Sequence, residues 1–169
     1  MKLAITDACI FIDLCDLEIV SVFFQLEVEI HTSLDVFGEL DPEQRDILKQ
    51  FQAKGKLTVH SITEQDRLII LGSAYPRSLS DNDKTVLYLA KKLQAMVLSS
   101  DKTVRHFAKG QAIENHGMIW IFDELVAASF LSLPEAAEKL QKLITMNFIY
   151  RNNVQLVAEM NLRLKKWKG

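Results

Sequence analysis

Short apolar runs that fit β-strands alternate along this chain with longer runs whose apolar residues recur at helical spacing. The strand-like runs are predicted at residues 3–6, 28–32, 56–61, 96–98 and 118–121. Strands that alternate with helices form a parallel sheet with helices on both faces. The pattern therefore predicts an α/β fold of three layers, with a central, mostly parallel sheet between two layers of helices.

The helices are predicted from their start signals and from apolar periodicity. Start signals stand at Ser33, Pro42, Thr63, Ser80, Ser100 or Asp101, Pro134, and Asn152 or Asn153. Residues 11–24 also carry apolar side chains at helical spacing, and this pattern places Asp13 on the solvent side. From Phe122 onward the chain is predicted to be wholly helical.

The length of 169 residues suits one domain with a substantial core. Hydrophobic residues make up 49% and charged residues 25%, which is an ordinary globular composition. No repeat, low-complexity segment or linker interrupts the chain. We therefore expect a single domain over residues 1–169, with a core of about 1–130 and extra C-terminal helices over about 131–169.

The charge and the apolar runs bear on location and partners. A formal net charge of -2 argues against nucleic-acid binding by bulk charge alone, although metal ions can supply positive charge locally. No signal peptide is evident, and no apolar run reaches the ~18 residues that span a bilayer. The sequence thus predicts a cytoplasmic protein without a membrane partner. Its two cysteines, Cys9 and Cys15, read as small buried side chains.

Four acidic residues lie at the edges of the predicted elements. Asp7 and Asp101 end strand-like runs, Asp83 opens a helical run, and Glu39 lies near the end of a short helix. The carboxyl ends of parallel strands meet at one edge of a sheet, so these acids are expected to converge in one crevice. Carboxylates in one pocket repel each other unless protons or hard cations neutralise them. The sequence therefore predicts a Mg²⁺ or Mn²⁺ site.

The segments around these acids resemble the motifs of PIN domains in order and spacing. In that family the first metal-site aspartate ends the opening strand, as Asp7 does here. The similar segments span residues 7–14, 33–40, 79–90 and 97–108, and the resemblance covers about the first 125 residues. The resemblance implies a magnesium- or manganese-dependent endoribonuclease.

The same resemblance implies roles for individual residues and partners. Asp7, Glu39, Asp83 and Asp101 would be the metal ligands. Ser99 matches a hydroxyl position beside the last aspartate, and Asp123 is an auxiliary fifth acid that varies among members. Many small bacterial and archaeal members are toxins of toxin–antitoxin pairs, similar to the VapC group, so an antitoxin protein and a second copy of the chain are expected partners beside the RNA substrate.

Lys102 and Arg105 recur at helical spacing just after Asp101 and are predicted to contact RNA phosphates. A solvated helix face explains the same spacing. The acids also have a plain structural explanation, since Asp83 and Asp101 stand at helix starts, where carboxylates stabilise the helix dipole.

Two other functions compete with the nuclease. A PIN-like module that is weakly active or inactive and acts in RNA or protein binding would keep the same scaffold. A different carboxylate–metal enzyme on an α/β sheet is the other alternative. Haloacid-dehalogenase-like phosphatases need Asp-x-Asp after the first strand, where this chain has Asp7-Ala8-Cys9.

Overall fold

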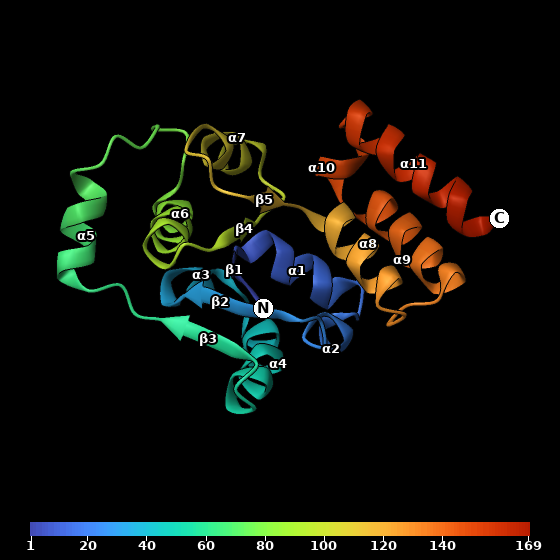
Figure 1. The fold of residues 1–169 in the computed structure, drawn as a ribbon, viewed down its shortest axis with the longest axis horizontal. Helices are drawn as coiled ribbons and strands as arrows, with labels where there is room; N and C mark the ends of the chain where they lie inside the picture. The colour runs from blue at the N-terminus through green and yellow to red at the C-terminus, as the bar shows by residue number, and fades with distance from the viewer. The chain divides into compact units, whose positions relative to one another are not determined.

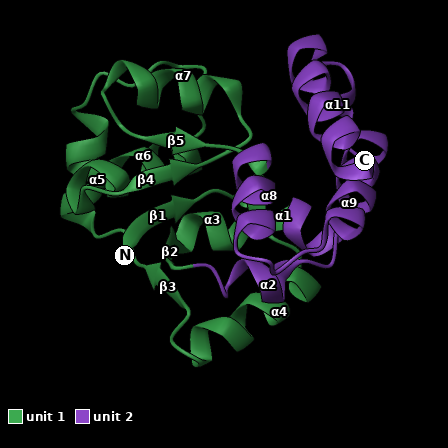
Figure 2. Cartoon of the chain, turned by 45° about the vertical axis from the view of Figure 1, so that its right-hand side comes forward, with its two compact units in different colours: residues 1–12, 27–118 green, residues 13–26, 119–169 purple.

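The computed structural model describes residues 1–169 (Figure 1). The chain forms two compact units (Figure 2). Unit 1 consists of residues 1–12 and 27–118, and unit 2 consists of residues 13–26 and 119–169. The prediction of one domain over the whole chain is not tested by this division and stays a prediction. None of the helices is long and apolar enough to cross a membrane.

A five-stranded sheet forms the centre of unit 1, and all of its strand pairs are parallel. The strands lie in the order β3-β2-β1-β4-β5. Their bounds are Lys2–Thr6 for β1, Val28–Ser33 for β2, Leu57–His60 for β3, Met96–Leu98 for β4 and Asn115–His116 for β5. The second half of β1 and the whole of β4 are buried, with Ala4, Ile5, Thr6, Met96, Val97 and Leu98 at most 4% exposed, as a sheet covered on both faces requires. The predicted three-layer α/β architecture is confirmed.

The strand order reverses at β1. From β1 the chain proceeds outward to β2 and β3, and it then returns to the other side of β1 to form β4 and β5. In open α/β sheets, ligands bind in the crevice outside the carboxyl ends of the strands at such a reversal. The register pairs Ile5 with Val97 and Thr6 with Leu98, so β1 and β4 end side by side. The crevice of this fold is therefore expected at the ends of β1 and β4.

Five helices belong wholly to unit 1. They are α3 (Leu34–Glu39), α4 (Pro42–Ala53), α5 (Glu64–Leu71), α6 (Asp81–Leu93) and α7 (Lys102–Gly110). With right-handed crossovers, the reversal of strand order places α4 on one face and α6 and α7 on the other. Helix α6 contacts β1, β2 and β4, and its apolar side chains Val86, Leu87 and Leu89 are buried.

The predicted start signals act as helix caps. Ser33 caps α3, and Thr63 and Ser80 form capping boxes with the third residue of their helices. Asp101, one of the two predicted candidates, caps α7. These short polar side chains accept hydrogen bonds from backbone N–H groups that have no partner within the helix.

The predicted strand at 118–121 is wrong, because these residues form the first turn of α8 (Met118–Ala127). The strand of this region is β5, two residues before it. The apolar residues of the run continue as Met118, Ile121, Phe122 and Leu125, all at most 1% exposed. That spacing is helical, and a run of four apolar residues is too short to distinguish a strand from a buried helix turn.

The predicted helix over 11–24 is two helices, α1 (Ala8–Asp16) and α2 (Val20–Phe23). Glu18 lies between them with φ 56°, a left-handed conformation that does not continue a helix. The placement of Asp13 on the solvent side is also wrong, because Asp13 is only 4% exposed.

Unit 2 is helical, as predicted from Phe122 onward. Besides α2 and most of α8 it contains α9 (Leu133–Met146), α10 (Phe148–Arg151) and α11 (Val154–Lys168). Helix α9 contacts α10 and α11, and the buried side chains of this packing include Leu140, Leu143, Met160 and Leu164.

Candidate acidic active site

Asp7 lies at the centre of the predicted crevice. It follows β1 directly, and its backbone N–H donates to the carbonyl of Leu98 at the end of β4, at 3.1 Å. Its side chain is only 3% exposed. Oδ1 accepts a hydrogen bond from the backbone N–H of Ile10 at 3.1 Å, and Oδ2 accepts one from the hydroxyl of Ser99. The strand reversal therefore holds a buried carboxyl in a fixed orientation.

Ser99 joins Asp7 to Asp101. The Ser99 hydroxyl is fully buried, donates to Asp7 and accepts the backbone N–H of Asp101 at 3.0 Å. The side chain of Asp101 caps α7, since Oδ1 accepts the N–H groups of Thr103 and Val104 at 2.7 and 3.1 Å. The Ser99 hydroxyl thus fixes the backbone of Asp101, which follows β4, relative to the side chain of Asp7, which follows β1.

Asp83 occupies the first turn of α6. Its Oδ2 accepts the backbone N–H of Ser80 at 3.1 Å, while its own N–H donates to the Ser80 hydroxyl at 3.1 Å. This capping box uses one carboxylate oxygen of a partly buried side chain. The sequence prediction that an acid starts this helix is confirmed, and its structural role is that of a cap.

Glu39 is the last residue of α3 and is exposed. Its Oε1 accepts a hydrogen bond from the side-chain amide of Asn82, the residue before Asp83. The hydroxyls of Ser33 and Thr85, both buried, lie 2.7 Å apart and fasten the start of α3 to α6. These two contacts bring Glu39 to the end of α6 that carries Asp83.

The charges of Asp83 and Asp101 act on the carboxyl of Asp7. Burial raises the pKa of this carboxyl from 3.8 to about 7, and the hydrogen bonds from Ser99 and Ile10 oppose the rise. The negative charges of Asp83 and Asp101 raise it further. A carboxyl that is half protonated near neutral pH, with two carboxylates close by, is a local excess of negative charge that a proton or a cation can neutralise.

The chemistry of these side chains fits a hard divalent cation, which prefers oxygen ligands. The side chains do not form a preorganised coordination site, because no group of three or more His, Cys, Asp or Glu side chains is arranged to hold an ion. Asp7 uses both of its oxygens for hydrogen bonds, whereas Asp83 and Asp101 each use one. The carboxylate oxygens that could bind a metal thus lie at one edge of the sheet, and some of them accept hydrogen bonds at helix caps.

The two predicted RNA contacts differ in their surroundings. Lys102 is the first residue of α7 and is exposed. Arg105 is half-buried, and its Nε donates to Oδ1 of Asn115 in β5 at 3.1 Å. Its guanidinium also lies against Gly117, where an added Cβ would come within 3.1 Å of Nη1. Arg105 therefore connects α7 to β5, while Lys102 is exposed to solvent. Their role in RNA contact stays a prediction.

Asp123 belongs to α8 in unit 2, where its carboxylate pairs with Arg163 of α11. The distances are 2.9 Å from Nη2 to Oδ2 and 3.3 Å from Nε to Oδ1. This two-pronged pair raises the pKa of Arg163. The predicted auxiliary role of Asp123 stays a prediction, and its observed contact joins two helices of unit 2.

Sequence reasoning missed a polar network on the α6 side of the sheet. Nδ1 of His31 in β2 lies 2.8 Å from Nε2 of His60 in β3, and burial lowers the pKa of both imidazoles. Nearby, Asp66 accepts hydrogen bonds from the Tyr88 hydroxyl and from Lys92. These pairs depend on strand register and helix packing, and no spacing along the chain signals them.

A doubly wound parallel sheet with buried and capping acids at its reversal point defines an α/β protein with an acidic crevice. A family model described as PIN domain matches residues 3–162, and the chain belongs to that family.

Solved structures were also compared with the chain. A domain of a functionally unknown protein from Methanocaldococcus jannaschii is 20% identical, with 69% of this chain and 91% of that chain covered and a TM-score of 0.49. A PilT N-terminus domain protein from Sulfolobus solfataricus is 11% identical, with coverage of 71% and 90% and a TM-score of 0.46. VapBC2 from Rickettsia felis, bound to a DNA fragment from its promoter, is 9% identical, with coverage of 69% and 98% and a TM-score of 0.43. None of the curated protein sequences compared with the chain matches it.

Proposed function

We propose that this protein is a divalent-metal-dependent endoribonuclease that hydrolyses RNA phosphodiester bonds at the acidic crevice. Its membership of the PIN domain family supports the proposal, because PIN domains are generally nucleases. The observation that carries it is the buried carboxyl of Asp7, whose pKa of about 7 reflects burial and the nearby charges of Asp83 and Asp101. A solvent-excluded acid at the strand reversal costs stability and has its natural use at a ligand site.

The acids would hold a Mg²⁺ or Mn²⁺ ion through their oxygen atoms: Asp7, Glu39, Asp83 and Asp101. Such an ion supplies a water of lowered pKa and stabilises charge on the phosphate that is attacked. Asp7 loses its proton more easily when a cation is near, since a positive charge lowers the pKa of a carboxyl. Ser99 orients Asp7 and fixes the backbone of Asp101, and it acts as a positioning residue behind the acids.

RNA contacts beside the acids belong to the same proposal. Lys102 is exposed at the first position of α7, one residue after Asp101, and its ammonium group suits a phosphate next to the scissile bond. Arg105 would support this contact through its hold on β5. Asp123 would be an auxiliary acid of the site.

The cellular setting that we propose follows from the family. Toxins of the VapC group pair with an antitoxin and form homodimers, and we propose both partners for this chain, together with a cytoplasmic location. Exposed apolar side chains on α5, namely Leu68, Ile69 and Leu71, offer a surface that a partner could cover.

A second candidate function is a PIN-like module that binds RNA or protein without cleaving it. The observation that favours it is the capping role of the acids: Asp83 and Asp101 each satisfy a helix start, which is a sufficient structural reason for an aspartate.

Cleavage of a mixed RNA pool by wild type and Asp101→Asn separates the two functions. The nuclease proposal expects cleavage by wild type with Mg²⁺ or Mn²⁺, and loss of cleavage with EDTA or in the variant. Asparagine keeps the capping oxygen, so the variant retains its fold and thermal unfolding verifies this. Folded wild type that cleaves nothing with either metal supports the binding module, and equal activity in the variant indicates a contaminating nuclease.

A further inference from the structure

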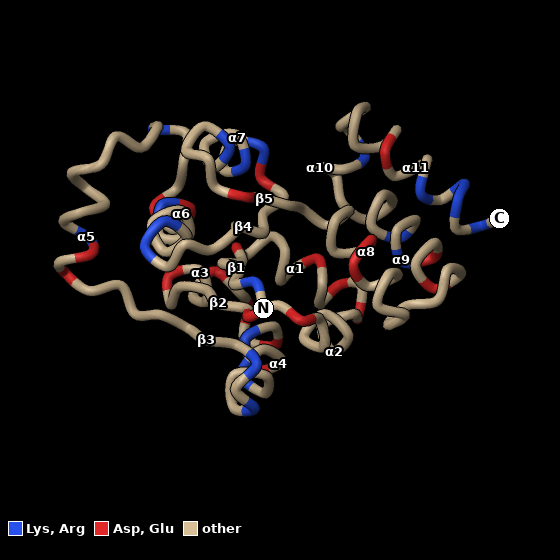
Figure 3. Tube along the Cα trace, in the orientation of Figure 1, with Lys and Arg blue, Asp and Glu red and all other residues tan.

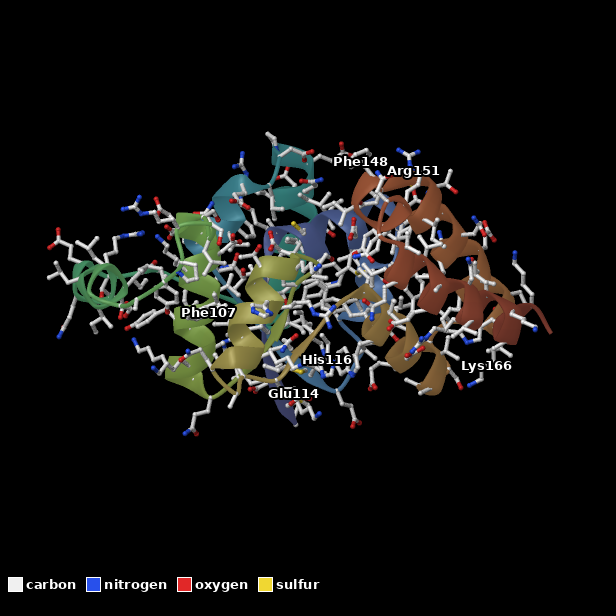
Figure 4. The ribbon with its side chains drawn as sticks, turned by 90° about the horizontal axis from the view of Figure 1, so that it is seen from above. Phe107, Glu114, His116, Phe148, Arg151 and Lys166 are labelled. Atoms are coloured by element: carbon white, nitrogen blue, oxygen red, sulfur yellow. The ribbon has the colours of Figure 1, made fainter.

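Unit 1 contains a second recess besides the acidic crevice, between α5, α6, α7 and the loop after α5. It is a pocket of about 450 Å³, a size typical of small-molecule sites. Three aromatic residues line it, namely Tyr75, Tyr88 and Phe107. Figure 4 shows Phe107 where α7 lies beside α6. No acid of the crevice lines this pocket, so it is a separate feature of the fold.

The aromatic walls are held in place by specific contacts. The rings of Tyr75 and Phe107 are 5.2 Å apart at an angle of 43° and form one wall. Tyr88 forms another, and its hydroxyl donates to Asp66, which is itself fixed by the capping box with Thr63. Flat, oriented π-faces of this kind are what a stacked nucleobase needs, and stacking is tolerant of base identity.

The charged residues at the pocket are positive. Lys91 and Lys92 of the last turn of α6 line it, and none of its lining residues is acidic. Both lysines are exposed; Lys92 donates to Asp66 at 3.3 Å and its Nζ lies 5.7 Å from the centre of the Tyr88 ring. An anionic ligand with an aromatic part matches this combination, because the lysines suit a phosphate and the rings suit a base.

Helix geometry relates the pocket to the acidic crevice. Helix α6 has acidic residues in its first turn and basic residues in its last (Figure 3). At 1.5 Å per residue, Lys91 lies roughly 12 Å along α6 from Asp83, and Phe107 lies roughly 9 Å along α7 from Asp101. A short single strand of RNA can cover such a distance, so one strand can reach both places.

We propose that this pocket binds a nucleotide of single-stranded RNA, with the base against Phe107, Tyr75 and Tyr88 and a phosphate beside Lys91. The proposal rests on the ribonuclease function and adds to it a subsite some nucleotides away from the bond that is cleaved. Ser73 and Gln111, which also line the pocket, carry polar side chains that suit the polar edge of a base. The Tyr75 hydroxyl is a hydrogen-bond donor at neutral pH, as any tyrosine hydroxyl is.

Binding of a short, fluorescein-labelled single-stranded RNA in EDTA tests the pocket without cleavage. Phe107→Leu keeps an apolar side chain and removes the π-face, so affinity should fall about 5- to 100-fold. Lys91→Gln should weaken binding and reduce the slope of log affinity against log salt by about 0.7. Phe51→Leu in α4 and Lys54→Gln just after it are matched controls that should bind as wild type does, because neither residue lines the pocket.

Photo-crosslinking of wild type with RNA that carries 5-iodouracil gives an answer that depends on no variant. Crosslinks to peptides containing Tyr75, Tyr88 or Phe107 are expected, and crosslinks elsewhere alone would overturn the proposal. Wild-type affinity in Phe107→Leu would overturn it as well. A third result would also overturn the proposal: Phe107→Leu abolishes capture of a partner protein and leaves RNA affinity unchanged. The pocket would then be a protein-docking site.

The outcomes for the pocket and for the nuclease are separable. If RNA binds at the pocket and is never cleaved, the pocket proposal is supported and the nuclease proposal is contradicted. If wild type cleaves RNA in a metal-dependent manner while Phe107→Leu changes neither the affinity for RNA nor the cleavage pattern, the proposal for the pocket is overturned and the nuclease proposal is left intact. Failure of wild type to bind single-stranded RNA defeats the pocket.

Discussion

Two buried aspartates, Asp7 and Asp13, lie six positions apart in the chain and differ in the side chains that surround them. Asp7 in unit 1 is next to the charges of Asp83 and Asp101, and its pKa is raised to about 7. Asp13 in unit 2 accepts hydrogen bonds from Asn147 at 2.9 Å and from the Tyr150 hydroxyl at 3.0 Å, and its pKa is raised to about 6. Burial is the largest cause of both shifts.

The difference lies in what each carboxyl does for its unit. Asp13 connects α1 with the start of α10 through two neutral donors, and the only like charge that acts on it is that of Asp16. Asp7 is placed among like charges, which destabilise the folded state unless something neutralises them. Burial alone therefore does not distinguish the two acids. What distinguishes Asp7 is that two carboxylates from other elements, Asp83 and Asp101, act on it, whereas Asp13 has only the exposed Asp16 of its own helix and two neutral donors.

The largest expected effect is on RNA cleavage. Asp7→Asn should lower the rate about 10²- to 10⁴-fold, because the site loses an anionic oxygen donor and a titrating group. Asp13→Asn should cleave at nearly the wild-type rate. Single-turnover assays with Mn²⁺ compare the two, and equal losses would show that the distinction between these aspartates has no functional meaning.

The next effect is on stability and its pH dependence. The pKa of Asp7 is about 7 in the folded protein against an ordinary value of 3.8, so the folded protein retains a proton that the unfolded chain loses between these values. The free energy of unfolding therefore falls as pH rises from about 4 to 7 and stays low above it. Asp7→Asn should raise the free energy of unfolding by about 2–4 kcal/mol at pH 8.

At pH 4 the same variant should gain little, because Asp7 is largely protonated in the folded protein there. Urea unfolding in EDTA at both pH values measures the two gains. A variant that is less stable than wild type at pH 8 would mean that the Asp7 carboxylate stabilises the fold, contrary to the effect expected from its burial among like charges.

A smaller effect of opposite sign is expected at Asp13. At pH 5, below the pKa of about 6 that Asp13 has in the folded protein, Asp13→Ala should lower the free energy of unfolding by about 1–3 kcal/mol, because the buried Tyr150 hydroxyl and the Asn147 amide lose their acceptor. Asp16→Ala removes an exposed aspartate from the same helix and should change stability by about 0.5 kcal/mol or less. If the two variants unfold alike, the hydrogen bonds of Asp13 contribute nothing measurable.

The smallest effect concerns Asp123. Asp123→Asn weakens its ion pair with Arg163, which is partly exposed, so the loss of stability should be about 0–1 kcal/mol. A double-mutant cycle with Arg163→Gln measures the pair directly. A coupling energy well above this range would show that the pair holds α8 and α11 together more strongly than its exposure suggests.

The elements with strong local signals were predictable from the sequence. Capping residues such as Ser80 and Thr63 fix helix starts by contacts within three residues, so they are visible in the chain itself. The last strand offered no such cue, because β5 is only two residues long and polar. The apolar run after Gly117 has the composition of a buried strand, and it therefore attracted a strand prediction that belongs two residues earlier.

The arrangement of the candidate site was predictable only in part. That Asp7 and Asp101 share one edge of the sheet follows from parallel strands, and the structure confirms this edge. The link from Asn82 to Glu39 and the burial of Asp13 were not predictable, because they depend on how helices pack over long separations in sequence. Helical spacing alone placed Asp13 on the solvent side, and the hydrogen bonds that allow its burial come from residues more than 130 positions away.

Calorimetric titration of Mn²⁺ into metal-free protein tests the central claim most directly, since it measures the acidic crevice without a substrate. We expect that wild type binds Mn²⁺, that Asp7→Asn and Asp101→Asn bind it at least about tenfold more weakly, and that Asp13→Asn binds it as wild type does. Wild type that binds no Mn²⁺, or Asp7→Asn that binds it unchanged, would contradict the assignment of this crevice as a metal site.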